Sequence, residues 1–100
     1  MRIEQDDPAF RRWVSSLDCC IPGCKTPGIH PHHVKLKSQG GKDPMNVIPI
    51  CWKHHTECHD NKQGMIMFFI DHNIDPFIIA GDVTGLYESI TDAFGYGCPL

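Results

Sequence analysis

Six of the seven histidines in this chain fall within residues 30–59, which read HPHHVKLKSQGGKDPMNVIPICWKHHTECH. This segment contains the adjacent pair His32 and His33 and ends in a Cys-x-x-His-His-x-x-x-His run from Cys51 to His59. Imidazole nitrogen and thiolate sulfur are the donors that bind zinc and related ions in proteins. The segment is too short to fold alone, so we expect it to be a metal-binding centre on which the rest of the chain packs.

Length and composition indicate one folded domain. The chain has 100 residues, of which 41% are apolar and 21% charged, as in ordinary globular proteins. No apolar run approaches the roughly 20 residues of a membrane span, and the first residues lack the apolar core of a signal peptide. We therefore expect a cytoplasmic protein without a membrane partner. In such a reducing compartment, the six cysteines favour metal binding over a disulfide framework.

The charges are distributed unevenly. The formal net charge is -3, but all nine Lys and Arg side chains lie between Arg2 and Lys62. After Lys62, the only charged residues are Asp and Glu. A locally basic face can bind phosphate even when the total charge is negative. Charge alone is equally compatible with an ordinary solvated surface.

The N-terminal region carries the signals of a helix. Asp7 can cap backbone N–H groups, and Pro8 suits the first helical position. Apolar residues then recur at i, i+3, i+4 and i+7, namely Phe10, Trp13, Val14 and Leu17. This spacing predicts a helix over about residues 8–17, with Arg11 and Arg12 off the apolar stripe and facing solvent or a ligand.

The histidine-rich segment predicts two strands and a helix. Residues 30–36 alternate loosely and predict a short strand, residues 38–44 a polar turn, and residues 46–50 the returning strand. Pro49 marks an edge strand or a strand end, because proline cannot donate a backbone hydrogen bond. A helix is expected over residues 51–62.

The C-terminal region, residues 63–100, predicts helical cover for the metal-binding segment. Residues 65–73 begin with an apolar run, which favours a buried helix. Asp75 and Pro76 repeat the start signal seen at Asp7, and apolar residues near helical spacing continue to Phe94. Cys98 and His72 have no assigned role.

Spacing separates a first set of candidate ligands, suited to a closed structural zinc site. Pro22 and Gly23 form a turn that can bring cysteines on either side to one ion. A Cys3His set is typical of structural zinc. Its members are Cys24, either Cys19 or Cys20, Cys51 and His54. Cys58 competes with these as the fourth ligand, because it lies four residues after His54 on the same expected helix.

The second set leaves coordination positions open, as a catalytic metal requires. It consists of His32, His55 and His59, the last two on one face of the expected helix. The neighbouring His33 suits a general base, because neutral imidazole accepts a proton near physiological pH. Asn46, on the facing strand, could hold that imidazole in orientation.

The order His32-His33, Asn46 and Cys51-x2-His54-His55-x3-His59, preceded by cysteines ending in Pro-Gly-Cys, resembles the HNH endonucleases of the ββα-metal class. The motif covers about residues 19–59, and the flanks are similar to short stand-alone HNH proteins of phages and prophages. His30 offers an alternative pairing for the first strand. The resemblance implies an α+β fold in which a ββα-metal (His-Me finger) hairpin and helix with a zinc knuckle, residues 19–62, is wrapped by N- and C-terminal helices in a single nuclease domain, residues 1–100.

Site roles follow from the same resemblance. It implies that His33 is the general base for hydrolysis of a DNA phosphodiester and that Asn46 steadies the hairpin and the base. It implies that His32, His55 and His59 hold Mg²⁺ or another divalent ion on the scissile phosphate. The implied ligands of the structural Zn²⁺ are Cys19, Cys24, Cys51 and His54.

DNA is the expected partner, and Lys35, Lys37 and Lys42 lie close in sequence to the expected catalytic residues, where they could bind phosphates. The resemblance places the protein in a bacterial cell or a phage-infected host, with phage or host DNA-processing proteins as possible further partners. The alternative is a non-catalytic zinc-binding module that docks DNA or a protein.

Overall fold

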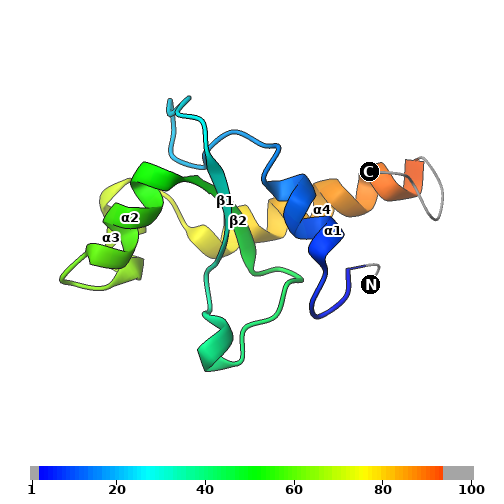
Figure 1. Cartoon of the computed structure of the whole chain (residues 1–100), viewed down its shortest axis with the longest axis horizontal. Helices are drawn as coiled ribbons and strands as arrows, with labels where there is room; N and C mark the ends of the chain where they lie inside the picture. The colour runs from blue at the N-terminus through cyan, green and yellow to red at the C-terminus, as the bar shows by residue number, and fades with distance from the viewer. Residues whose placement is uncertain (1–2, 94–100) are drawn as a thin grey trace.

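A two-stranded antiparallel hairpin lies at the centre of the computed structural model, which describes residues 3–93 (Figure 1). Strand β1 spans Ile29–His33 and strand β2 spans Val47–Cys51. Helix α2, Trp52–Asp60, follows β2 without an intervening loop. The predicted α+β class is therefore confirmed, as is the hairpin followed directly by a helix.

Two prolines fix how the strands pair. Pro31 lies opposite Pro49 in the register. Because neither has an N–H, the pair suits a position without hydrogen bonds between the strands. The Pro49 carbonyl instead accepts a hydrogen bond of 2.8 Å from the Cys20 backbone N–H. Pro49 thus lies within an edge strand, and its carbonyl holds the cysteine-rich loop, residues 19–24, beside β2.

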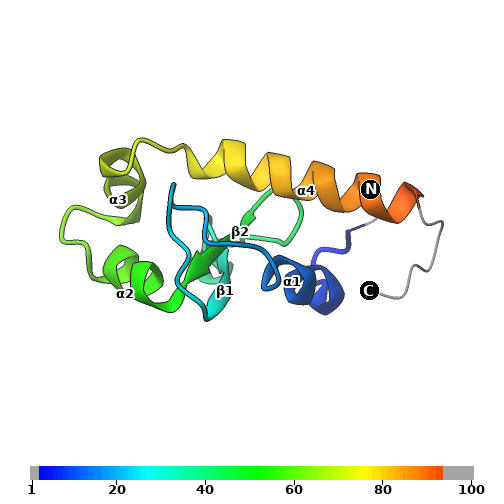
Figure 2. The ribbon, with the colours of Figure 1, turned by 90° about the horizontal axis from the view of Figure 1, so that it is seen from above.

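Helices cover both sides of the hairpin. Helix α4, Pro76–Ala93, runs along one side, while α1, Pro8–Val14, and α2 lie on the other (Figure 2). Helix α3, Met65–Asp71, lies beside α2 and precedes α4. No helix within residues 3–93 combines the length and apolar character needed to cross a membrane.

The ends of several elements differ from expectation. Helix α1 begins as predicted, with the Asp7 carboxylate accepting from the Phe10 N–H at 3.0 Å, but it ends at Val14 rather than near residue 17. The hydroxyls of Ser15 and Ser16 bond to backbone carbonyls of the last turn, which favours helix termination. Strand β1 ends at His33 rather than residue 36, α2 at Asp60 rather than 62, and α3 at Asp71 rather than 73.

Strand β2 is buried at all five positions and contributes to two apolar clusters. One cluster joins Ile48 and Ile50 to the cysteine-rich loop, α3 and α4. The other joins Val47 to Phe10 and Val14 of α1 and to α4. The predicted burial of α3 is only partly correct, because Phe68 and Phe69 are buried whereas Ile66 and Ile70 are 46% and 53% exposed. Phe94 and Cys98 lie outside the described residues.

Candidate metal centres

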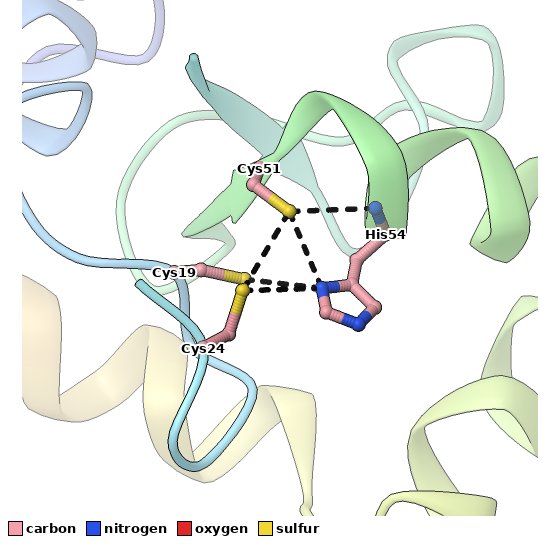
Figure 3. A group of neighbouring side chains, drawn as sticks. All are labelled: Cys19, Cys24, Cys51 and His54. Carbon is pink, nitrogen blue, oxygen red and sulfur yellow. Dashed lines mark hydrogen bonds between the residues drawn. The ribbon is translucent and has the colours of Figure 1, made fainter. Parts of the chain in front are cut away.

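Three thiols and one imidazole converge where the cysteine-rich loop meets the junction of β2 and α2 (Figure 3). The group consists of Cys19, Cys24, Cys51 and His54. The Sγ atoms of Cys24 and Cys51 are 3.8 Å apart, and the His54 Nδ1 lies 3.2–3.7 Å from the three sulfurs. A tetrahedral zinc with bonds of about 2.3 Å to sulfur has sulfur–sulfur edges of about 3.8 Å. These donors therefore fit a metal ion such as zinc.

Local backbone structure places the four donors. The Cys51 Sγ caps α2 by accepting from the His54 N–H at 3.5 Å, which brings these two ligands together across the first helical turn. In the loop, Gly23 adopts a left-handed φ of 78°, and the Cys24 N–H donates to the Ile21 carbonyl. This turn bends the chain so that Cys24 meets Cys19 at the same cluster.

The cluster decides between the alternatives left open by the sequence. It contains Cys19 rather than Cys20, and His54 rather than Cys58. Cys58 is fully buried in the apolar core, where burial raises its thiol pKa to about 11. Burial likewise raises the pKa of Cys20 to about 12. All five cysteines among the described residues are free thiols, so a disulfide framework is not formed there.

A second group brings together three imidazoles from β1 and α2, namely His32, His55 and His59. The Nε2 atoms of His55 and His59 are 2.9 Å apart. His32 is only 3% exposed, and its buried Nε2 has no hydrogen-bond partner. An unsatisfied buried nitrogen is destabilising unless another group binds it. Burial, with the nearby imidazoles, lowers the His32 pKa to about 4, which keeps this nitrogen free to bind an ion.

His30 borders this second group, although sequence suggested only an alternative strand pairing for it. Its Nδ1 lies 2.9 Å from the Nδ1 of His55. The two nitrogens of His55 therefore face different partners: Nε2 faces His59 and Nδ1 faces His30. The i, i+4 spacing predicts the contact of His55 with His59, but only the strand register brings His30 to the same helix.

His33 contacts a carboxylate for which no role was predicted. Its Nε2 lies 2.7 Å from an oxygen of Asp43, which is fully buried. Asp43 also pairs with Arg11 at 2.5 Å. The same Arg11 nitrogen pairs with the exposed Asp6 at 2.6 Å, so Arg11, expected to face solvent or a ligand, joins an internal and a surface carboxylate. In the sequence, Asp43 stands out only as the one acidic residue in a turn that is otherwise uncharged or basic. That feature does not indicate which residue it contacts.

Asn46 does not orient the His33 ring as expected. Its side-chain oxygen accepts from the Lys35 N–H at 2.7 Å, and its amide donates to the Lys35 carbonyl at 2.9 Å. Gly41 packs against the same peptide so closely that a Cβ there would lie 1.8 Å from the Lys35 oxygen. Asn46 therefore steadies the hairpin, as predicted, while Asp43 replaces it as the partner of His33.

The three lysines expected to contact DNA are exposed and lie on the hairpin loop. Lys37 forms an ion pair of 3.1 Å with Asp6, and Lys42 donates to Gln5. These residues line a surface hollow of about 370 Å³ together with Gly40 and Gly41. The loop and the N-terminal segment thus form one polar surface of mixed charge.

Comparisons with known proteins give one informative relative. The chain is 32% identical over 82 residues to "Uncharacterized protein YdfU" from Escherichia coli (strain K12), an alignment that covers 72% of this chain and 23% of that protein. The chain therefore spans about a quarter of the length of this relative. No family model and no solved structure matches the chain.

Proposed function

We propose that this protein is a metal-dependent DNA endonuclease of the HNH type, with a ββα-metal hairpin and helix. The observation that carries the proposal is the open three-imidazole group with an unsatisfied buried nitrogen on His32, directly followed in β1 by His33. A closed group of three thiols and one imidazole lies at the start of the same helix, α2. Sites with free coordination positions are typical of catalysis, whereas closed sites are typical of structure.

Each group of residues has a separate role in the proposed hydrolysis. His32, His55 and His59 would hold a divalent ion, which when bound would supply Lewis-acid stabilisation of charge at the scissile phosphate. Zinc, iron or nickel suits these nitrogen donors better than magnesium does. His33 removes a proton from the attacking water as the water oxygen bonds to phosphorus. The bond between phosphorus and the leaving oxygen breaks, and the leaving oxygen takes up a proton from solvent. Cys19, Cys24, Cys51 and His54 would hold zinc, which would fix the start of α2.

DNA as the substrate is supported by the exposed lysines of the hairpin loop. Lys35, Lys37 and Lys42 are all solvent-accessible and lie within the loop that joins the two strands. Lysines bind phosphate oxygens without reading bases. We therefore propose cleavage directed by DNA shape, or by a partner protein, rather than by sequence.

The direct test is nicking of supercoiled plasmid by zinc-loaded protein with added Mn²⁺ or Mg²⁺. His33→Ala should remain folded and retain zinc, but it should cut DNA about 100-fold more slowly or worse, because the general base is removed. His55→Ala should keep the zinc but should no longer bind the divalent ion of the three-imidazole group, so it should not cut DNA. Full activity of His33→Ala contradicts the assignment. One bound zinc, no second ion and no nicking by the wild type would instead favour a non-catalytic zinc module.

A further inference from the structure

We propose that Asp43 is a positioning residue that fixes the orientation and the proton position of the His33 imidazole. The inference rests on the proposed nuclease function, since it assigns Asp43 a part in presenting the general base. It adds a carboxylate outside the histidine and asparagine positions of the motif. The carrying observation is the 2.7 Å contact between the His33 Nε2 and the Asp43 Oδ1.

The Asp43 carboxylate is held in place from several directions. Its Oδ2 accepts from the Asp7 backbone N–H and from the Arg11 guanidinium, each at 2.5 Å. Its own backbone N–H donates to the Gln5 carbonyl at 2.9 Å. The side chain is fully buried, so the other oxygen, Oδ1, is left for His33 and is little screened by water. The N-terminal segment and the hairpin loop therefore determine where the imidazole can lie, and Arg11 of α1 adds a compensating charge.

The charge state of Asp43 determines which His33 nitrogen carries the proton. Burial alone raises the pKa of the Asp43 carboxyl, but the bonds from Asp7, His33 and Arg11 outweigh it and hold the pKa below its ordinary value. An ionised carboxylate only accepts hydrogen bonds, so the His33 Nε2 must be the donor. In the neutral imidazole, Nδ1 then has the free lone pair. The contact with Asp43 therefore fixes one tautomer and one ring orientation of His33, in which Nδ1 can accept a proton from the attacking water.

Arg11 provides a way to separate positioning from simple structural support. A buried carboxylate is costly unless it is paired, and Arg11 supplies the pairing charge at Oδ2, whereas His33 contacts Oδ1. Removing Arg11 should therefore weaken the fold while leaving the His33–Asp43 contact in place. Removing Asp43 should weaken the fold and also abolish the contact with His33.

The experiment compares Asp43→Ala, Asp43→Asn and Arg11→Met as zinc-loaded full-length proteins with Mn²⁺ and plasmid DNA. The kcat of Asp43→Ala should fall by about 10–100-fold, the range for loss of an outer partner of a site residue, with KM unchanged. Asp43→Asn should recover part of the kcat, because its amide oxygen can still accept from Nε2. In ¹H–¹⁵N spectra, the His33 ring proton, assigned by its absence in His33→Ala, should be seen in wild type and Arg11→Met but lost in Asp43→Ala.

Three results would overturn the positioning role while leaving the nuclease assignment intact. They are a wild-type kcat in folded Asp43→Ala, an unchanged His33 ring-proton signal in that variant, and a loss of kcat in Arg11→Met as large as in Asp43→Ala. If Asp43→Ala does not fold, Asp43→Asn decides, because a wild-type kcat together with an unaltered ring-proton signal contradicts the proposal. A wild-type protein that never cuts DNA overturns both proposals together.

Discussion

The Nδ1 atoms of His30 and His55 lie 2.9 Å apart. If His55 binds an ion through Nε2, its Nδ1 carries a proton and His30 is the acceptor that orients the ring. His30→Ala should therefore weaken divalent-ion binding at the His32, His55 and His59 group by about tenfold. His30→Gln, which keeps an acceptor, should weaken it less. Titration of zinc-loaded protein with Co²⁺, followed by visible absorption, measures both, and equal affinities for wild type and His30→Ala would contradict this role.

The adjacent thiols Cys19 and Cys20 should respond differently to the same substitution. Cys19→Ser removes a donor from the closed group, so the protein should lose its tightly held zinc and melt at a much lower temperature. Cys20→Ser is the matched control and should retain one zinc per chain. Metal content after dialysis, joined to thermal unfolding, distinguishes the two variants. Zinc loss in Cys20→Ser but not in Cys19→Ser would reverse the ligand assignment.

Asn46 should be important for stability rather than for metal binding. Asn46→Ala leaves the Lys35 N–H and carbonyl without their partners, which should lower the free energy of unfolding by about 2–4 kcal/mol. Asn46→Asp keeps an acceptor for the N–H but places a carboxylate oxygen against the Lys35 carbonyl, so it should also be destabilised. Chemical denaturation gives the stability, and metal titration should show unchanged affinity for both ions. A variant with unaltered stability but no DNA cutting would instead indicate a direct part in the reaction.

Acid should destabilise the protein through His32 when the open group holds no ion. The folded pKa of His32 is about 4, mainly because of burial, whereas an unfolded histidine titrates near 6.5. Below about pH 6.5 the unfolded chain gains a proton that the folded chain does not, so stability falls by up to about 1.4 kcal/mol per pH unit. Urea unfolding of zinc-loaded protein at several pH values measures this slope. His32→Asn should show a shallower slope, and an identical one would show that other groups cause the acid sensitivity.

The sequence predicted the elements whose signals are local. The cap at Asp7, the i, i+4 pair His55 and His59, and the x2 spacing of Cys51 and His54 each involve neighbours within one helical turn, and each is found in the structure. The spacing left Cys19 and Cys20 equivalent. The Pro49 carbonyl, which holds the Cys20 peptide beside β2, is a tertiary contact, and spacing carries no information about it.

The contacts that the sequence did not predict are either long-range or depend on which side chains are buried. Arg11 lies off the apolar stripe of its helix, which suggests solvent exposure, yet it reaches a carboxylate 32 residues away. Asn46 was expected to contact His33 because it lies on the returning strand, but the hairpin loop folds back and uses its amide to hold Lys35. Ile66 and Ile70 lie in an apolar run that resembles core, although they are about half exposed. Periodicity cannot determine which face of such a run is covered.

His54 and His55 are consecutive residues of α2, and they belong to different metal groups. One short helix therefore carries candidate ligands of both groups. An ion bound at either group would hold the helix in the orientation that the other group needs. We expect the two binding events to be positively cooperative, with each ion raising the affinity for the other by the same factor. Removing zinc from the closed group would then lower the affinity of the open group for its ion, although all three of its imidazoles are unchanged.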